Sequence, residues 1–156
     1  MTLRSLLYAI RKSLSKSFSN SLPIEEILSV GFLEIYKELL KTVNDKDVII
    51  EIGWSLTNIA ALHPSSISKM RDIGIHNQLL SLLNGSFEQQ HQVLWALGNI
   101  LSESITTRNE LLEKGLLKYL KKVLGNRLLS LSFVKIIAWV LSTLTRGKPS
   151  PPESQV

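Results

Sequence analysis

A repeat of about 40 residues constrains the fold of this 156-residue chain more than any other feature. Three tryptophans are separated by 41 and 44 residues: Trp54, Trp95 and Trp139. Three glycines recur at nearly the same spacing, each between two stretches with helical patterning: Gly31, Gly74 and Gly115. A glycine in this position ends one helix in a left-handed turn and allows the next helix to start. Two independent landmarks with one period indicate a repeat protein.

Each repeat has the pattern of a short helix, a glycine turn, a middle helix, a second turn and a long third helix that carries the tryptophan. One middle helix places its apolar residues so that one face is buried: Leu116, Leu117, Leu120, Val123 and Leu124. Residues that favour turns follow the middle helices: Asn44 to Lys46, Asn84 to Ser86, and Gly125 with Asn126. The sequence therefore predicts an all-α fold, a right-handed α-solenoid of about three to four armadillo repeats.

Three segments are expected along the chain. Residues 1–22 form the N-terminal helix of a partial first repeat, with these residues at helical spacing: Leu6, Leu7, Ile10 and Leu14. The alternative is a mitochondrial leader, because basic residues alternate there with serines and no acid precedes Glu25. Residues 23–146 form the armadillo repeats, and residues 147–156 form a proline-rich tail. No polar capping repeat is apparent, which predicts apolar surface at the C-terminal end and either self-association or a longer protein.

Composition removes several classes of function. The chain has no cysteine, which excludes disulfides, thiolate metal sites and redox chemistry. The longest apolar runs fall short of the roughly 20 residues that span a bilayer, so no membrane contact is expected. The net charge of +5 is spread among interspersed acids, which argues against nucleic-acid binding. The only histidines are not spaced for a metal or a catalytic dyad: His63, His76 and His91. We expect neither an enzyme nor a cofactor.

The third helices carry a polar pattern beside their tryptophans. An asparagine follows four residues after the first two tryptophans, at Asn58 and Asn99, so ring and amide share one helix face. An asparagine amide can bind the backbone of an extended peptide, and indole faces attract Lys and Arg by about 0.5 to 2 kcal/mol. This ladder favours an extended basic peptide as ligand. The alternative is that the tryptophans belong to the core and the asparagines are solvated.

The same helices resemble signatures of the importin alpha family. The matching segments are W-S-L-T-N-I-A from Trp54, W-A-L-G-N-I from Trp95, and W-V-L-S-T-L-T-R-G-K-P from Trp139. The resemblance runs from about Leu7 to the end of the chain. It implies a receptor of the cytoplasm and nucleus that binds nuclear-localisation signals in a concave groove. It implies these peptide-binding residues, with Glu103 holding the key lysine of the signal: Trp54, Asn58, Trp95, Asn99, Glu103, Trp139, Thr143 and Arg146.

At five positions the sequence departs from the family pattern. Thr143 replaces the third ladder asparagine, and four further residues replace a glycine, a threonine, a glutamate and an asparagine of the family: Leu62, Ile67, His91 and Ile136. These changes make the expected groove less polar and favour a second hypothesis, an armadillo scaffold that binds another partner. A third hypothesis, a mitochondrial or RNA-associated basic protein, rests only on the N-terminus and the charge.

Two parts of the importin alpha family have no counterpart in this sequence. The basic arm that binds importin beta in the family is not found before Leu7, and the later repeats of the family are also missing. The resemblance therefore implies signal binding by this stretch without implying a contact with importin beta.

Overall fold

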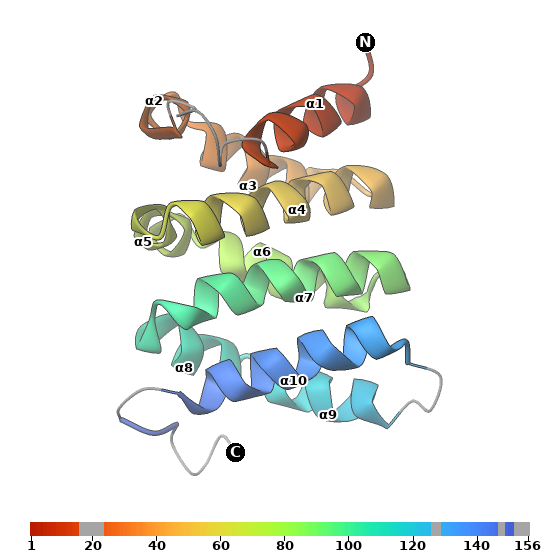
Figure 1. Cartoon of the computed structure of the whole chain (residues 1–156), viewed down its shortest axis with the longest axis vertical. Helices are drawn as coiled ribbons and strands as arrows, with labels where there is room; N and C mark the ends of the chain where they lie inside the picture. Colours follow the sequence, from red (N-terminus) through yellow and green to blue (C-terminus); the bar gives the residue numbers. More distant parts are fainter. Residues whose placement is uncertain (16–23, 126–128, 147–148, 152–156) are drawn as a thin grey trace.

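The computed structural model describes residues 1–15, 24–125, 129–146 and 149–151, and within these ranges all regular structure is helical (Figure 1). In chain order the helices are α1 (Leu3–Ser15), α2 (Ile24–Ser29), α3 (Phe32–Thr42), α4 (Lys46–Leu62), α5 (Ser65–Asp72), α6 (Ile75–Ser81), the 3₁₀ turn η1 (Leu82–Asn84), α7 (Phe87–Ser102), α8 (Ile105–Glu113), α9 (Leu116–Leu124) and α10 (Leu131–Thr145).

These helices form three successive units of short, middle and long helix: α2 to α4, α5 to α7, and α8 to α10. The long helices α4, α7 and α10 lie side by side in one layer, with the middle helices α3, α6 and α9 behind them (Figure 1). Helix α1 packs against α4 in the place that the third helix of a preceding repeat would take. The described residues thus confirm the predicted armadillo-repeat solenoid of about three to four repeats.

The glycine turns have the predicted left-handed geometry. The backbone φ angles are 80° at Gly31, 75° at Gly74 and 92° at Gly115, and each glycine directly precedes a middle helix. Residues with a β-carbon are strained in this region of φ, so glycine is the residue that allows the two helices to meet at a sharp turn. The periodic glycines therefore set the angle between short and middle helix in every repeat.

Each long helix begins at a side-chain cap. Asp45 accepts hydrogen bonds from the backbone N–H groups of Asp47 and Val48 at the start of α4. Ser86 and Ser130 make the corresponding bonds at the starts of α7 and α10. A polar cap of this kind stabilises a helix by about 1 kcal/mol. The turn residues that precede the tryptophan helices thus fix where those helices begin.

The core runs continuously along the solenoid between the two layers. Leu56 of α4 and Leu97 of α7 are fully buried, and so are Leu116 and Leu120 of α9. Two leucines expected on buried faces are exposed instead: Leu6 of α1 and Leu124 of α9. Each lies at the edge of the buried face of its helix. A helix in a two-layer solenoid buries only part of its circumference, so residues at this edge stay exposed.

The predicted segment boundaries at residues 22 and 146 stay a prediction, because residues 16–23, 126–128, 147–148 and 152–156 lie outside the described residues. At the C-terminal end of the solenoid, α10 exposes Leu131 and Val134, while self-association through this end stays untested. Among the helices that the structure describes, none is both long and apolar enough to cross a membrane.

Candidate peptide-binding ladder

The exposed side of the long-helix layer carries five of the predicted site residues on three successive helices. We call it the ladder face and define it by these residues: Trp54, Asn58, Trp95, Asn99 and Trp139. The side chains of Trp54 and Trp95 are each 38% exposed, so both rings are anchored in the layer and still reach solvent. Helix α4 packs against α7 and α7 packs against α10, and Asn99 contacts α4 while Trp139 contacts α7 across these pairs.

The middle step of the ladder joins α7 to α4 through side-chain amides. Asn99 Nδ2 donates a hydrogen bond to the backbone carbonyl of Thr57 at 3.2 Å. Gln92 Nε2 donates to the hydroxyl of the same threonine, also at 3.2 Å, and this bond is buried. The bond from Asn99 uses one of the four hydrogen-bonding sites of an asparagine amide, which orients the amide for a further partner.

The last step of the ladder packs Trp139 onto a glycine. A β-carbon at Gly98 of α7 would clash with the indole ring of Trp139, so only glycine lets the ring lie against that helix. Trp139 is consequently more buried than the other two tryptophans. The glycine in the segment W-A-L-G-N thus leaves space for the tryptophan ring of the following repeat.

The first step of the ladder contains an arginine that the sequence interpretation did not assign to the site. The guanidinium carbon of Arg11 in α1 lies 4.3 Å from the ring centre of Trp54 and 4.9 Å from that of Tyr8. Its Nε donates to the carboxylate of Glu51 at 2.5 Å. Tyr8 precedes Trp54 by 46 residues, and this near-period spacing was the available signal that α1 extends the ladder.

The amide of Asn58 is also engaged by α1. Its Nδ2 donates to the hydroxyl of Ser15 at 2.9 Å, across 43 residues of sequence. Asn58 and Asn99 therefore bind different kinds of acceptor, a side-chain hydroxyl at the first step and a backbone carbonyl at the second.

Thr143 occupies the third amide position without presenting its hydroxyl to the ladder face. The side chain is 5% exposed, and its Oγ1 donates to the backbone carbonyl of Trp139 at 2.9 Å. A threonine hydroxyl has a single donor, which this intrahelical bond uses. The role of Thr143 in peptide binding stays a prediction.

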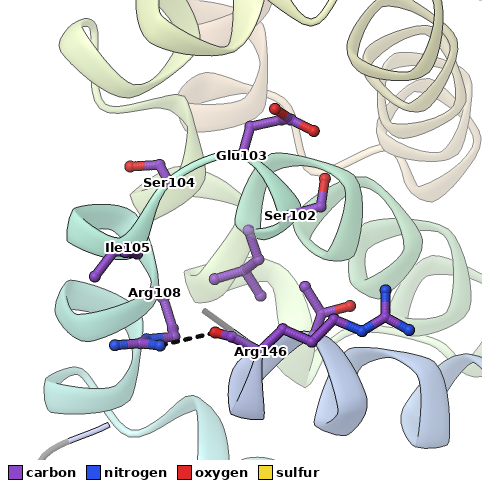
Figure 2. A pocket seen from close by; sticks show the side chains of 8 residues that line it. Ser102, Glu103, Ser104, Ile105, Arg108 and Arg146 are labelled. Atoms are coloured by element: carbon purple, nitrogen blue, oxygen red, sulfur yellow. Dashed lines mark hydrogen bonds between the residues drawn. The ribbon is translucent and has the colours of Figure 1, made fainter. Parts of the chain in front are cut away.

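A cavity of about 320 Å³ at the end of α7 brings three predicted residues together: Glu103, Thr143 and Arg146 (Figure 2). Glu103 caps the C-terminal end of α7 and is exposed. Figure 2 shows its carboxylate turned away from the guanidinium of Arg146. The role of Glu103 in holding a lysine stays a prediction.

Arg108 forms the wall of the cavity on the side of α8 and was not foreseen from the sequence. Its side chain is 1% exposed. Its two terminal nitrogens donate to the carbonyls of Arg146 at 3.0 Å and Pro149 at 2.8 Å, and its Nε donates to Asn109. This guanidinium holds the chain that follows α10 against α8.

Two of the positions that depart from the family pattern, Ile67 and Ile136, pack in or against the apolar core. Ile67 of α5 is buried and Leu62 at the end of α4 is half-buried, and neither lines the cavity beside Glu103. Ile136 is half-buried in α10 and packs against the core.

His91 belongs to an aromatic cluster beside the second tryptophan. Its ring centre lies 6.5 Å from those of Phe87 and Trp95 and 5.8 Å from that of Phe133. Burial among these rings lowers the pKa of His91. The spacing of Phe87, His91 and Trp95 at every fourth residue was the signal that could have revealed this cluster. In the part of the chain that the structure describes, no group of three His, Asp or Glu residues is placed to hold a metal ion.

Comparison with solved structures gives the class of protein. A designed armadillo repeat protein, solved in complex with the peptide (KR)4, superposes with a TM-score of 0.76 and 26% identity over 91% of this chain and 57% of that one. An engineered protein superposes with a TM-score of 0.78 and 25% identity, over 97% of this chain and 58% of that one. The chain is an armadillo-repeat protein.

Curated relatives place this armadillo protein more closely. It is 33% identical over 141 residues to importin subunit alpha-2 of Arabidopsis thaliana, which covers 90% of this chain and 26% of the relative. It is 30% identical over 148 residues to the probable importin subunit alpha-A of Dictyostelium discoideum, with 86% and 27% covered. The predicted resemblance to the importin alpha family is confirmed, and the chain spans about a quarter of the length of these relatives. No established family profile matches it.

Proposed function

We propose that this chain binds an extended Lys/Arg-rich segment of another protein along the ladder face, as a receptor for nuclear-localisation signals. In this role it is a binding protein rather than an enzyme, and it acts in protein import between cytoplasm and nucleus. The observation that carries the proposal is the row of half-exposed indoles, with an amide four residues after each of the first two. Because a fold alone does not define a function, the proposal rests on these side chains.

The chemistry of the ladder face suits such a segment. The backbone of an extended peptide presents N–H and C=O groups that an asparagine amide can bind regardless of the peptide's sequence. The indole faces attract the cationic ends and apolar stems of its Lys and Arg side chains. The Glu103 carboxylate at the cavity rim adds a negative charge where the ladder meets the end of α7. The designed armadillo protein that superposes on this chain was solved with a peptide of this composition.

A second candidate function is an armadillo scaffold whose ladder face holds a less basic segment. The rings of Phe87 and His91 beside Trp95, which pack on the buried Phe133, favour it because they offer an aromatic rather than an acidic surface. The buried hydroxyl of Thr143 favours it too, since the third step lacks an amide. Importin beta is not part of either proposal.

Fluorescence-polarisation binding of labelled (KR)4 peptide at physiological salt tests the first candidate. We expect the wild-type chain to bind at micromolar or lower concentration and Trp95→Ala to weaken binding by about tenfold, which corresponds to about 1.4 kcal/mol. Ile35→Ala is the control, because this exposed residue lies on α3 in the layer behind the ladder. A folded wild type that does not bind would reject the basic peptide and favour the scaffold.

A further inference from the structure

The first step of the ladder is already filled by a basic side chain of the chain itself. We propose that Arg11 is an internal occupant of the Trp54 site, which closes this step to a peptide cation and restricts cation binding to the part of the ladder that begins at Trp95. The inference rests on the proposed function and defines where along the ladder face a basic peptide can bind.

The contacts of Arg11 are those expected of a bound peptide arginine. Its guanidinium lies 4.3 Å from the centre of the Trp54 ring, within the 6 Å or so over which a cation interacts with an aromatic face. The ion pair with Glu51 closes at 2.5 Å, and the two side chains are only 14% and 12% exposed. Water and salt therefore screen this pair far less than an ion pair on the surface.

The amide of the first step is engaged in the same way. Asn58 donates to the hydroxyl of Ser15, one turn beyond Arg11 on the same helix. Helix α1 thus supplies both groups that a peptide would bring to the ladder: a cation for the indole and an oxygen acceptor for the amide. A peptide at this step would have to displace the Arg11 side chain from the indole, and it would find one hydrogen-bonding site of the Asn58 amide already used.

The later steps differ at one equivalent position. Helices α1, α4 and α7 each carry an aromatic residue of the ladder layer. The residue three positions after it is Arg11 in α1, Thr57 in α4 and Gly98 in α7. In the last case this residue lies directly under the tryptophan of the next helix, as Arg11 does under Trp54. Thr57 and Gly98 are uncharged, so neither places a cation on the ladder.

A positive charge already fixed at Trp54 disfavours a second one at short range. Coulomb repulsion between like charges is strong where the surroundings are partly buried. A peptide lysine placed at Trp54 would therefore meet repulsion from Arg11 and find Glu51 already neutralised. At the next step the residue equivalent to Arg11 is the uncharged Thr57, so we expect a lysine at Trp95 to meet less repulsion.

The test is a titration with (KR)4 peptide, monitored by NMR through the indole N–H signals of the three tryptophans, each assigned with a Trp→Phe variant. In the wild type we expect the Trp95 signal to shift and the Trp54 signal to stay in place. In Arg11→Met, which keeps the apolar stem and removes the charge, we expect the Trp54 signal to shift as well. Affinity should rise about 3- to 30-fold, since the freed indole and carboxylate gain a cation.

Arg4→Met is the matched control, because Arg4 lies on the same helix in an exposed ion pair with Asp47 and should leave both signals as in the wild type. A Trp54 signal that shifts in the wild type as strongly as that of Trp95 would overturn the inference while leaving the proposed function intact. The wild-type titration needs no variant, so this outcome counts even where Arg11→Met fails to fold. A wild type in which no indole signal shifts would reject the proposed function and this inference with it.

Discussion

The first and last steps of the ladder use the same helical layout and treat their tryptophans in opposite ways. Between α1 and α4, a charged side chain lies on the Trp54 ring. Between α7 and α10, the Trp139 ring lies directly on Gly98. The residue three positions after an aromatic residue therefore decides whether the next indole is covered by a cation or packed onto backbone. Trp95 lies on the helix between these two steps and is 38% exposed, and we propose it as the centre of the candidate site.

The two steps also place their arginines differently. Arg11 lies on the ladder face, where it faces an indole and a carboxylate. Arg108 of the last repeat lies at the edge of the cavity, and the hydrogen bonds that the structure shows for it run to oxygens of uncharged groups. A buried guanidinium depends on its hydrogen bonds to offset the cost of leaving water. The first arginine contacts the proposed binding face, whereas the second joins the chain that follows α10 to α8.

The largest effect is expected from Arg108→Met. Removing the guanidinium loses its bonds to the carbonyls of Arg146 and Pro149, and each hydrogen bond to a charged group contributes about 1.5 to 3 kcal/mol. We expect the free energy of unfolding, measured in urea, to fall by about 3 kcal/mol. Arg4→Met, which breaks an exposed ion pair, should change it by about 1 kcal/mol or less. Equal losses in the two variants would show that the carbonyl contacts of Arg108 add little.

A smaller effect is expected at the glycine of the last step. In Gly98→Ala the new methyl group clashes with Trp139, and overpacking of this kind costs about 1 to 3 kcal/mol. Gly53→Ala is the matched control in α4, where the β-carbon would lie 3.2 Å from Cγ of Gln92, a milder contact than the clash with Trp139 at Gly98. There the better helix propensity of alanine offsets the contact, so thermal unfolding should change little. A Gly98→Ala protein as stable as wild type would mean that Trp139 moves away without cost.

The sequence was sufficient to predict the solenoid because its landmarks are local. A left-handed turn requires glycine, and a long helix that carries tryptophan and asparagine four residues apart needs no distant partner to be recognised. Gly31, Gly74 and Gly115 confirm the turns, and Trp54 and Trp95 lie half-exposed in one layer.

The contacts between repeats could not be predicted in the same way. Arg11 reaches Glu51 across 40 residues and Arg108 reaches Pro149 across 41, and no pattern within one repeat reveals either pair. The N-terminus was interpreted from its basic composition and from the helical spacing of its apolar residues, so the place of Tyr8 in the ladder was missed. Spacing alone can also mislead. Thr143 stands at the spacing of a ladder residue, but its hydroxyl donates to the backbone carbonyl of Trp139 in the same helix.

The smallest effect is expected from a carboxylate that joins the last two repeats on α8, away from the ladder face. Glu110 accepts hydrogen bonds from Lys114 at 2.6 Å, from Asn77 at 3.0 Å and from His76 at 3.0 Å. The bonds from Lys114, Asn77 and His76, in that order of importance, lower the pKa of Glu110 to about 2.

Because the pKa of Glu110 is lower in the folded chain than in the unfolded one, its contribution to stability is complete above about pH 4.5 and is lost as the pH falls toward 2. We expect Glu110→Gln to lower the Tm by about 2 °C at pH 7, with the difference from wild type shrinking steadily between pH 4.5 and pH 2.5. Glu38→Gln is the control, since that carboxylate has only a 3.8 Å contact with the exposed Lys41. A Tm difference for Glu110→Gln that stays constant over this pH range would show that the carboxylate joins the two repeats by packing rather than by charge.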